Sequence, residues 1–463
     1  MRERYNIAFL GGGPAGYQGA IRAAQLGARV AVVEERLLGG VCLNRGCIPT
    51  KTVRASAEVA QYMRRAREYG FQPVEVAPDM TAIIARKERV VANLRRSIER
   101  LFQARRIDLL EGRGRLIAPN KIEMEKDGQV SLVEAEKVVI ATGSRPASLT
   151  LFPQESGFFL ADEMLNSTYL PAQLLVVGGG AIGVEMAAIF RELGSQVTLV
   201  EAQNRLLPSE DAEMSDYLQG VLRRRKVKII CGSRIKSANK TGGKFNVQLA
   251  DGMDLSLDAI LLAVGRHFNA EGIGLEEVGV TLEQGHIKVD EYMQTNVSGI
   301  YAAGDVIGGW LLAHVAFAEG ICAAENALGL ESRMDYRVVP RVIYSLPEYS
   351  AVGLSEEEAQ ITCSIKVARF PFKSLGMGQA MSELEGLVKI VSHAQTDQIL
   401  GAHIIGAHAG DLIPEIALAM KAGVPSRVIM QTIHPHPTLS EAVQEVAQAL
   451  HGRAIHILPQ EAA

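Results

Sequence analysis

An internal repeat constrains the fold of this chain more than any other feature of its sequence. A short apolar strand, a glycine-rich turn, a helical stretch and a second apolar strand ending in Glu occur twice. The first copy begins near residue 6 and closes on Glu34, and the second begins near residue 174 and closes on Glu201. In each copy 18 residues separate the last glycine of the turn from the Glu. The repeat therefore predicts two nucleotide-binding units nested in one chain.

The two turns share the spacing G-x-G-x-x-G. Their glycines are Gly11, Gly13 and Gly16 in the first copy, and Gly178, Gly180 and Gly183 in the second. In a Rossmann-type unit the first glycine makes the tight turn, the second lets backbone N–H groups approach a pyrophosphate, and the third permits close helix–strand packing. The N-terminus of the following helix stabilises the phosphate charge. A dinucleotide is thus expected at each turn.

The acidic residue that closes each copy bears on which dinucleotide is bound. Glu34 and Glu201 are expected to accept hydrogen bonds from an adenosine ribose, unless they are merely solvated strand ends. A carboxylate at the second position repels the extra phosphate of NADP. The second unit is therefore predicted to favour NAD.

The remainder of the chain follows a different pattern. Each copy later reaches a further strand that ends in glycine, at 138–143 and 260–265. After about residue 269 a strand and turn at 299–305 precede an apolar helix that ends near residue 328. From residue 340 onward β-branched runs alternate with helical stretches at 411–422 and 439–451, which indicates a separate α+β domain.

Composition excludes several classes of partner. With 48 Lys and Arg against 52 Asp and Glu, the net charge of -4 gives no overall attraction to nucleic acid or to an anionic membrane. The start of the chain lacks the apolar core of a secretion signal, so a cytoplasmic location is expected. The longest apolar stretch, residues 174–190, contains three consecutive glycines and Glu185 and is too short to span a bilayer. No membrane helix is predicted.

One region departs from this even balance. Residues 51–115 carry 15 Lys or Arg and 8 Asp or Glu, a net charge of +7. The simpler interpretation is a pair of long helices with solvated basic faces. The alternative is a docking face for an acidic protein domain; a nucleic-acid site is disfavoured because aromatic residues are not interleaved with the charges.

Two of the five cysteines form a candidate redox pair. Cys42 and Cys47 are five residues apart, which in an ideal helix separates their Cα atoms by roughly 8–9 Å, beyond the ~7 Å that a disulfide can bridge. A bridge therefore requires a distorted first turn, which Gly46 and Pro49 allow. No other Cys or His has ligand spacing to this pair, so no metal site is predicted. The other three read as small core residues, namely Cys231, Cys322 and Cys363.

Together these motifs resemble the flavoprotein disulfide reductases, and within them the dihydrolipoamide dehydrogenases. The segments that carry the resemblance are the run Gly40–Lys51, both glycine turns, Ala141-Thr142-Gly143, Ala303-Gly304-Asp305 and the ending His434–Glu441. They occur in order from residue 6 to about residue 450. The resemblance implies an NAD-dependent enzyme that contains FAD and an active-site disulfide and oxidises protein-bound dihydrolipoamide. It also implies a homodimer whose partner is a lipoyl-bearing protein of a 2-oxoacid dehydrogenase, glycine cleavage or other lipoyl system.

The resemblance further assigns roles to individual residues. Cys42 would exchange with the substrate, Cys47 would be the thiolate in contact with the flavin, and Lys51 and Glu185 would form an ion pair near the flavin. The residues implied to bind the two cofactors are Gly11, Gly13, Pro14, Ala15, Gly16, Glu34, Lys51, Thr142, Gly143, Gly178, Gly180, Gly183, Glu185, Glu201, Gly265, Gly304, Asp305 and Ala313.

Thiol–disulfide exchange also needs a proton acceptor tuned near neutral pH, for which histidine is the usual residue. His436 is the predicted base because Pro-Thr follows it directly, as in the family ending, and Glu441 would orient it. Thr438-x-x-Glu441 is equally a capping box for the last helix, so the role of Glu441 stays open. His434 is expected to be structural. The resemblance implies that His436 completes the active site of the other subunit.

The expected fold class is α/β, with two nested Rossmann-like domains and a C-terminal α+β dimerisation domain. The predicted boundaries are 1–147 for the FAD domain, 148–268 for the NAD domain, 269–338 for a central domain that completes the FAD site, and 339–463 for the dimerisation domain.

The sequence departs from the usual pattern of these enzymes in places, and rival functions exist. Val41 stands where Thr is usual, and Arg45 stands between the cysteines where a small apolar residue is usual. A glutathione reductase-like enzyme is the nearest rival, although such enzymes use NADPH and would carry basic residues at Glu201. A catalytically silent subunit that only binds a lipoyl-bearing complex is the rival from another class.

Overall fold

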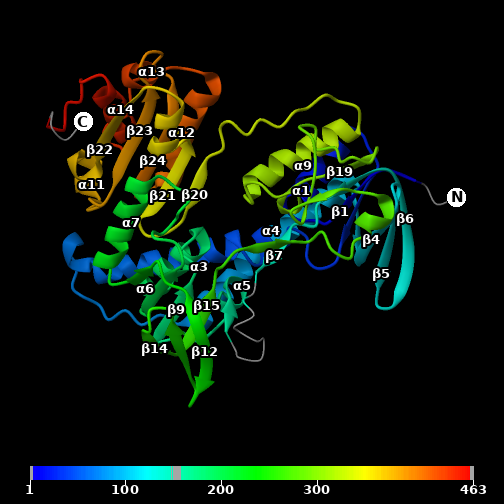
Figure 1. The fold of residues 1–463 in the computed structure, drawn as a ribbon, viewed down its shortest axis with the longest axis horizontal. Coiled ribbons are helices and arrows are strands. Elements are labelled where there is room, and N and C mark those ends of the chain that lie inside the picture. Colours follow the sequence, from blue (N-terminus) through cyan, green and yellow to red (C-terminus); the bar gives the residue numbers. More distant parts are fainter. Residues whose placement is uncertain (1–3, 148, 150–157, 459–463) are drawn as a thin grey trace. The chain divides into compact units, whose positions relative to one another are not determined.

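The computed structural model describes residues 4–147, 149 and 158–458, and in it the chain divides into two compact units (Figure 1). The first unit comprises Met1–Thr52, Ile84–Ala147 and Gly265–Asp335. The second comprises Val53–Ile83, Ser148–Val264 and Tyr336–Ala463. Each unit contains one copy of the sequence repeat.

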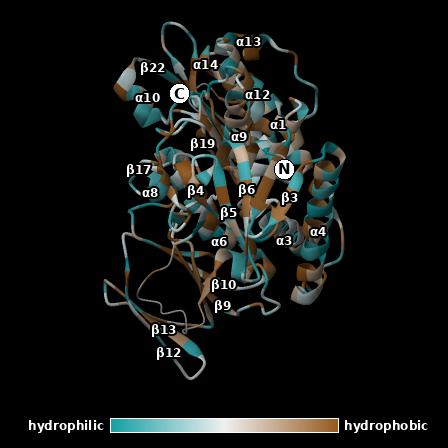
Figure 2. Ribbon diagram, turned by 90° about the vertical axis from the view of Figure 1, so that its right-hand side faces the viewer, coloured by the Kyte–Doolittle hydropathy of each residue, from teal (hydrophilic) through white to brown (hydrophobic). Residues whose placement is uncertain are grey.

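A seven-stranded sheet forms the centre of the first unit, in the order β3-β2-β1-β6-β5-β4 with β19 paired to β6. Its strands are β1 (Tyr5–Leu10), β2 (Val30–Glu34), β3 (Asp108–Glu111), β4 (Arg113–Ala118), β5 (Lys121–Lys126), β6 (Gln129–Ile140) and β19 (Ile300–Ala302). The pairs formed by β1, β2, β3, β6 and β19 are parallel, and β4 and β5 extend the sheet as an antiparallel meander. Parallel strands are covered on both faces, which is why residues 7–10 and 30–33 are continuous apolar runs (Figure 2).

Two helices of the first unit pack closely because small residues line their contact. They are α1 (Pro14–Gln25) and α9 (Ala313–Ala327). A Cβ added to Gly19 of α1 would lie 2.6 Å from the carbonyl oxygen of Gly320 in α9, and one added to Gly320 would lie 2.1 Å from that of Ala15. Figure 1 shows these helices side by side. The other elements of the unit are α2 (Gly40–Asn44), α8 (Leu275–Val278), β7 (Ser144–Pro146), β16 (Arg266–Phe268), β17 (Leu282–Glu283) and β18 (His286–Ile287).

The basic region forms the two long helices that its sequence predicted. They are α3 (Cys47–Arg64) and α4 (Met80–Arg105), each of which has residues in both units. None of the helices in the described part of the chain combines the length and apolarity needed to cross a membrane.

The second unit repeats the parallel arrangement, with strand order β11-β10-β9-β15-β8. The strands are β8 (Phe159–Leu160), β9 (Gln173–Val177), β10 (Gln196–Glu201), β11 (Lys228–Cys231) and β15 (Ala259–Leu262). Around them lie α5 (Ala161–Met164), α6 (Ala181–Leu193), α7 (Ala212–Arg224) and an antiparallel sheet of β12 (Ile235–Thr241), β13 (Lys244–Leu249) and β14 (Asp254–Leu257).

The C-terminal part of the second unit is an antiparallel sheet in the order β20-β21-β24-β23-β22. Its elements are β20 (Arg341–Ile343), β21 (Glu348–Gly353), β22 (Ile365–Pro371), β23 (Leu387–His393), β24 (Ile399–Gly406), α10 (Glu356–Thr362), α11 (Gly376–Ala380), α12 (Ala409–Ala422), α13 (Ser426–Gln431) and α14 (Glu441–Leu450). Helix α12 packs on β21 and β24, and α14 packs on β22 and β23. The predicted fold class, with its C-terminal α+β domain, is confirmed.

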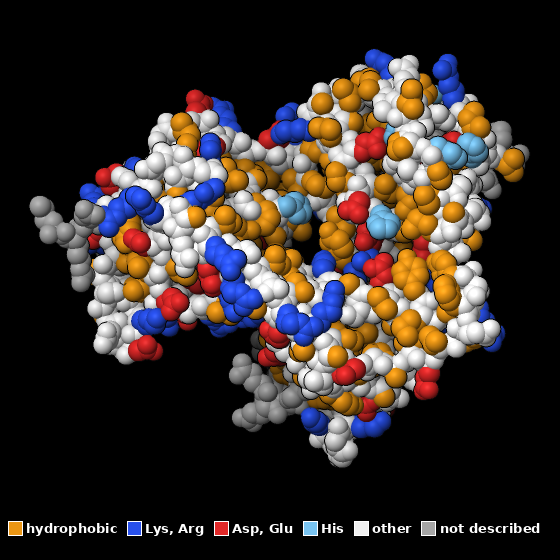
Figure 3. Space-filling model, turned by 180° about the vertical axis from the view of Figure 1, so that it is seen from behind, with side chains coloured by type: hydrophobic (Ala, Val, Ile, Leu, Met, Phe, Trp, Pro, Cys, Tyr) orange, Lys and Arg blue, Asp and Glu red, His pale blue; other side chains and the backbone are white. Residues whose placement is uncertain are grey.

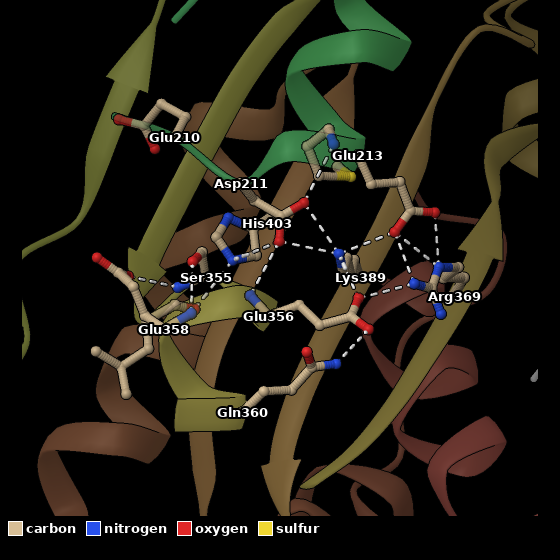
Figure 4. Close-up of polar contacts among 12 residues, drawn as sticks. Glu210, Asp211, Glu213, Ser355, Glu356, Glu358, Gln360, Arg369, Lys389 and His403 are labelled. Atoms are coloured by element: carbon tan, nitrogen blue, oxygen red, sulfur yellow. Dashed lines mark hydrogen bonds and ion pairs between the residues drawn. The ribbon is translucent and has the colours of Figure 1, made fainter. Parts of the chain in front are cut away.

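A buried ion network joins the two halves of the second unit (Figure 4). The ammonium of Lys389 in β23, 1% exposed, lies 2.9 Å from Oδ2 of the fully buried Asp211 and 2.8 Å from carboxylate oxygens of Glu213 and Glu356. Asp211 also caps α7, accepting a hydrogen bond of 3.1 Å from the Met214 amide. Burial acts to raise the pKa of Asp211, but His403 and Lys389 outweigh it and the pKa is lowered. Because a buried charge without its partner is strongly destabilising, the network fixes the start of α7 to β23.

The two units group the four predicted domains in pairs. The first unit combines the predicted FAD and central domains, and the second combines the predicted NAD and dimerisation domains with residues 53–83. The boundary predicted at 147/148 falls beside residues 148 and 150–157, which lie outside the described residues. The three boundaries between the four domains stay a prediction.

Candidate functional site

Only glycine fits the ends of the first dinucleotide turn. Gly11 follows β1 with φ +108° and donates its amide to the Val33 carbonyl at 2.8 Å. A Cβ on Gly11 would lie 2.3 Å from the carbonyl oxygen of Ala141, and one on Gly16 would lie 1.9 Å from that of Gly11. Both are closer than a real Cβ can approach, so the predicted tight turn and close packing are required here.

The second turn has the same geometry. Gly178 has φ +106° and donates to the Val200 carbonyl at 2.8 Å. A Cβ on Gly178 would lie 2.3 Å from the carbonyl oxygen of Ala263, and one on Gly183 would lie 1.8 Å from that of Gly178. The repeat in the sequence is thus a repeat of backbone geometry.

The middle glycines open each turn toward a ligand. Gly13 is the N-cap of α1, which begins with Pro14 and continues with Ala15, and Gly180 is the N-cap of α6. Neither helix has a side-chain cap or an acidic residue in its first turn. A Cβ on Gly180 would meet nothing within 4 Å, and one on Gly13 would meet only the Cα of Gly40 at 3.8 Å. Two helix N-termini without an acidic side chain therefore face open space, which fits the diphosphates of FAD and NAD.

Glu34 and Glu201 have a role that their sequence context did not reveal. Oε2 of Glu34 accepts the Gly12 amide at 2.7 Å, and Oε1 accepts the Arg36 amide at 2.8 Å. Oε2 of Glu201 accepts the Gly179 amide at 2.5 Å, and Oε1 accepts the Gln203 amide at 2.7 Å. Each carboxylate thus ties its glycine turn to the end of the neighbouring strand. A carboxylate has about four acceptor positions, so capacity for a ribose remains.

Asn269 braces the end of β6 and was not predicted. Its side-chain NH2 group donates to the Thr142 backbone carbonyl at 2.9 Å, and its backbone carbonyl accepts the Thr142 hydroxyl at 2.8 Å. Its own amide donates to the Gly143 carbonyl at 2.9 Å. Gly143 and Gly265 have φ +71° and +122°, and a Cβ on either would meet nothing within 4 Å. The only sequence signal for Asn269 was its position four residues after the strand-end Gly265.

Asp305 is held by side chains that are distant in the sequence. The Ser144 hydroxyl donates to Oδ2 of Asp305, and the Arg266 guanidinium donates to the Ser144 hydroxyl at 2.6 Å and lies 3.6 Å from the same carboxylate oxygen. The preceding amide, that of Gly304, donates to the buried Glu319 at 2.8 Å. Ser144, Arg266 and Glu319 were all missed. Ala313, also predicted for this site, is the first residue of α9.

The thiol pair lies where one helix ends and the next begins. Cys42 is in α2, which ends at Asn44, and Cys47 is the first residue of α3. The distortion expected from the spacing is thus a break, with Arg45 at φ -142° and ψ -6°. The cysteines are free thiols that are hydrogen-bonded to each other. This hydrogen bond and then burial raise the pKa of Cys42, while the ammonium of Lys51 opposes the rise.

The predicted partners Lys51 and Glu185 belong to different units. Lys51 is in the part of α3 that belongs to the first unit, and Glu185 lies in α6 of the second unit with 7% of its surface exposed. Oε1 of Glu185 accepts the Tyr344 amide at 2.8 Å. The Lys51–Glu185 ion pair stays a prediction.

His436 and His434 differ sharply in their surroundings. Nδ1 of His436 lies 2.8 Å from Oε1 of Glu441, and 76% of the His436 side chain is exposed. His434 is only 5% exposed, with Nδ1 3.0 Å from the Thr432 carbonyl and Nε2 2.9 Å from Glu415. The exposed imidazole is therefore the one whose second nitrogen can reach a substrate.

Glu441 combines the two roles between which its sequence context did not decide. Oε1 faces His436, while Oε2 accepts the Thr438 amide at 2.8 Å. The capping box is only half formed, because the N-cap of α14 is Ser440 and the Thr438 hydroxyl donates to the Pro435 carbonyl instead. Burial acts to raise the pKa of Glu441, but the Thr438 amide and His436 outweigh it, so the pKa is lowered. The carboxylate therefore stays ionised beside the imidazole.

Comparison with known proteins agrees with this geometry. Residues 5–320 match the family model described as pyridine nucleotide-disulphide oxidoreductase, and residues 339–447 match its dimerisation domain. The dihydrolipoyl dehydrogenase of Bacillus subtilis is 40% identical, with 98% of this chain and 100% of that protein covered. That of Thermus scotoductus is also 40% identical, over 98% and 99% of the two chains. The mitochondrial dihydrolipoyl dehydrogenase 1 of Arabidopsis thaliana is 37% identical, over 98% and 92%.

Solved structures extend the comparison to the fold. LpdA from Mycobacterium tuberculosis superposes with a TM-score of 0.90 at 31% identity, covering 96% of this chain and 99% of that one. The HOCl-induced flavoprotein disulfide reductase RclA from Escherichia coli, in its Cu(II) complex, gives 0.89 at 28% identity over 96% and 99%. The geometry of the site and the comparisons with known proteins lead to the same assignment: this chain belongs to the pyridine nucleotide-disulphide oxidoreductase family.

Proposed function

We propose that this protein is an NAD-dependent dithiol dehydrogenase that converts protein-bound dihydrolipoamide to lipoamide and forms NADH. The observation that carries the proposal is the hydrogen-bonded pair Cys42 and Cys47, in a chain 40% identical over nearly its whole length to dihydrolipoyl dehydrogenase. Enzymes of this family use FAD and NAD. When bound, FAD supplies two-electron transfer between a dithiol and a nicotinamide.

The thiol pair performs the exchange with the substrate. In the oxidised enzyme Cys42 and Cys47 share a disulfide, and a substrate thiolate attacks the sulfur of Cys42. The Cys42–Cys47 bond then breaks and Cys47 leaves as a thiolate. The second substrate thiolate attacks the mixed disulfide, which releases lipoamide and leaves Cys42 reduced. Lys51 favours the anionic sulfur of this pair, because its ammonium opposes the rise in the pKa of Cys42.

His436 accepts the proton that the substrate thiol loses in this exchange. A dithiol is a poor nucleophile until deprotonated, so an imidazole near the substrate accelerates attack by accepting its proton. Glu441 holds Nδ1 of His436 at 2.8 Å, which leaves Nε2 to face the substrate. The ionised Glu441 also stabilises the imidazolium that forms. Residues 339–447 match a dimerisation domain, and we propose that His436 acts in the site of the partner subunit of a homodimer.

A direct assay tests the function. The purified protein, saturated with FAD, is expected to form NADH from NAD and free dihydrolipoamide, and a visible absorbance change should follow addition of the dithiol alone. Reduction of glutathione disulfide with NADPH at a higher rate would show the rival glutathione reductase-like activity instead. The absence of any absorbance change on dithiol addition would identify a catalytically silent subunit.

Replacing Glu201 by Arg is expected to weaken the preference for NAD over NADP. The carboxylate repels the additional phosphate of NADP, and a guanidinium would attract it. The change also removes two hydrogen bonds to backbone amides, so we expect the kcat/KM with NAD to fall by about 10–100-fold. Initial rates with both cofactors measure the preference. Glu201→Gln removes the charge and keeps one acceptor oxygen, so it loses one of the two backbone hydrogen bonds rather than both. Equal efficiency of the unmodified enzyme with the two cofactors would refute this role of Glu201.

The partner and location follow as finer proposals. The natural substrate would be a lipoyl-bearing protein of a 2-oxoacid dehydrogenase, glycine cleavage or other lipoyl system. A working thiol pair with only 5 cysteines in the chain suits a reducing compartment, so we propose the cytoplasm.

A further inference from the structure

The outer face of α4 carries a line of arginines. Positions 89, 96 and 100 are separated by seven and four residues, so at 3.6 residues per turn their side chains lie along one line of the helix. Arg86 lies one turn before them on the same side. All four side chains are exposed, and we call them the arginine stripe: Arg86, Arg89, Arg96 and Arg100. The opposite side of the helix is the packed one, where Ile84, Val91 and Phe102 are buried.

The charge of the arginine stripe is not neutralised by the described residues. Arg86 donates to the Thr52 carbonyl at 2.8 Å, and Arg96 donates to the side chain of Asn93, both of which are neutral. No member of the stripe forms an ion pair within residues 4–147, 149 and 158–458. The two carboxylates of α4 are turned to other cations, since Glu88 lies 2.6 Å from Lys87 and Glu99 lies 3.8 Å from Arg95.

This arrangement has a cost for the helix that folding alone does not explain. Like charges four residues apart, as in Arg96 and Arg100, weaken a helix. Some exposed arginines elsewhere in the described part of the chain are paired, for example Arg115 with Glu123 at 2.8 Å and Arg145 with Glu271 at 3.2 Å, and others are not. The stripe is also the centre of a region of net charge +7 in a chain of net charge -4. On the face drawn in Figure 3, several Lys and Arg side chains lie close together.

Helix α4 contacts the segment that carries the thiols, which consists of α2, the break after it and the start of α3, and which we call the thiol loop. Nη1 of Arg95 donates to Oδ1 of Asn44 at 3.2 Å, and Asn44 stands between Cys42 and Cys47. Asn44 in turn donates to the Gly40 and Leu38 carbonyls at 2.9 and 3.1 Å. All of these residues belong to the first unit. The stripe is thus about one helix diameter, roughly 10–12 Å, from the loop that performs the exchange.

We propose that the arginine stripe is a docking surface for an acidic protein domain that bears the lipoyl group, an inference that rests on the proposed function. A lipoyl group on a lysine is a long flexible arm, so its domain must come to rest beside the thiol loop rather than on it. Arginine is suited to this contact because its guanidinium pairs with carboxylates in a bidentate manner. Nucleic acid is disfavoured, because Phe102 is the only aromatic residue of α4 and it is 2% exposed.

Charge reversal on the stripe tests the proposal. The triple variant Arg89→Glu, Arg96→Glu, Arg100→Glu is compared with two substrates: free dihydrolipoamide, and a purified, reduced lipoyl domain of net negative charge. At about 0.02 M salt we expect kcat/KM with the domain to fall by about 10–100-fold, because steering depends on complementary charge. At about 0.5 M salt the difference should shrink to about twofold, because ions screen the contact. The rate with free dihydrolipoamide should stay within about twofold of the unmodified enzyme.

Two further variants make the result specific to the stripe. Arg234→Glu, Lys236→Glu, Lys240→Glu, on exposed residues at β12, imposes the same change in net charge and should leave the domain reaction within about twofold. Arg89→Lys, Arg96→Lys, Arg100→Lys keeps the charge but removes the bidentate geometry, so it should lose less of the rate than the glutamate variant.

Three outcomes would overturn the docking surface while leaving the proposed function intact. They are an unchanged rate with the domain in the stripe variant, an equal loss in the β12 variant, and binding of a single-stranded oligonucleotide more tightly than the domain. Failure of the unmodified protein to oxidise even free dihydrolipoamide would instead reject the proposed function, and the docking proposal with it.

Discussion

Replacing either Cys42 or Cys47 by Ser should lower turnover with dihydrolipoamide by about 10³-fold or more, since both sulfurs are needed to relay two electrons. Cys42→Ser removes the sulfur that the substrate attacks, and Cys47→Ser removes the leaving thiolate. A hydroxyl can take neither role, because it forms no disulfide. Steady-state NADH formation measures the loss, and the absorbance change on dithiol addition should vanish with it.

Cys363→Ser is the matched control for this experiment. Cys363 follows α10 in the second unit and belongs to no pair, so its replacement should leave turnover within about twofold. The spectrum of bound FAD and the thermal midpoint should be close to normal in all three variants. Near-normal turnover in either Cys42→Ser or Cys47→Ser would show that the thiol pair is not the redox centre.

The fold was predictable because its strongest signals are local in the sequence. The apolar runs at residues 7–10 and 174–177 and the glycines that follow them specify strand, turn and helix within about 30 residues, and the structure has them there. The C-terminal sheet and its helices were found from β-branched runs for the same reason. The antiparallel meander of β4 and β5 was not predicted, since its short strands carry no such continuous run.

The parts of the site that the sequence did not reveal depend on contacts between distant segments. Asn269 holds Thr142 across 127 residues, and Arg266 holds Ser144 across 122. No spacing rule connects such positions, because the contact exists only after the sheet has formed. The same holds for Arg95, which belongs to the basic region and lies against Asn44, 51 residues earlier. Local patterns thus predicted the residues that we propose to react, and long-range packing supplies the residues that hold them.

Glu34, Glu201 and Glu441 each combine a structural contact with a proposed functional one. Each was interpreted from its sequence as having one function, or one of two competing functions. In the structure Glu34 and Glu201 each accept a backbone amide at both oxygens and keep further acceptor positions for a ribose. Glu441 accepts a backbone amide at one oxygen and faces His436 with the other. Substitution of such a residue is therefore expected to change both geometry and chemistry, and even Glu→Gln would lose one of the accepted hydrogen bonds together with the charge.

His436→Ala should lower turnover by about 10²–10⁴-fold, the usual contribution of a positioned general base. The imidazole is 76% exposed on its own chain, and the match to a dimerisation domain over residues 339–447 supports a role in the partner subunit's site. If each site is built from two chains, then differently damaged subunits can complement each other. Mixing variants therefore distinguishes a shared site from one contained in a single chain.

The mixing experiment uses Cys47→Ser and His436→Ala, which should each be nearly inactive as homodimers. After subunit exchange, a heterodimer holds one site with both defects and one site with neither. Activity per heterodimer should therefore recover toward about half of that of the unmodified dimer. Differently tagged subunits allow the heterodimer to be purified, and unmodified dimers passed through the same exchange control for damage. Were purified heterodimers to stay inactive while those controls survive, His436 would act within its own chain or not at all, because a site with neither defect would never have formed.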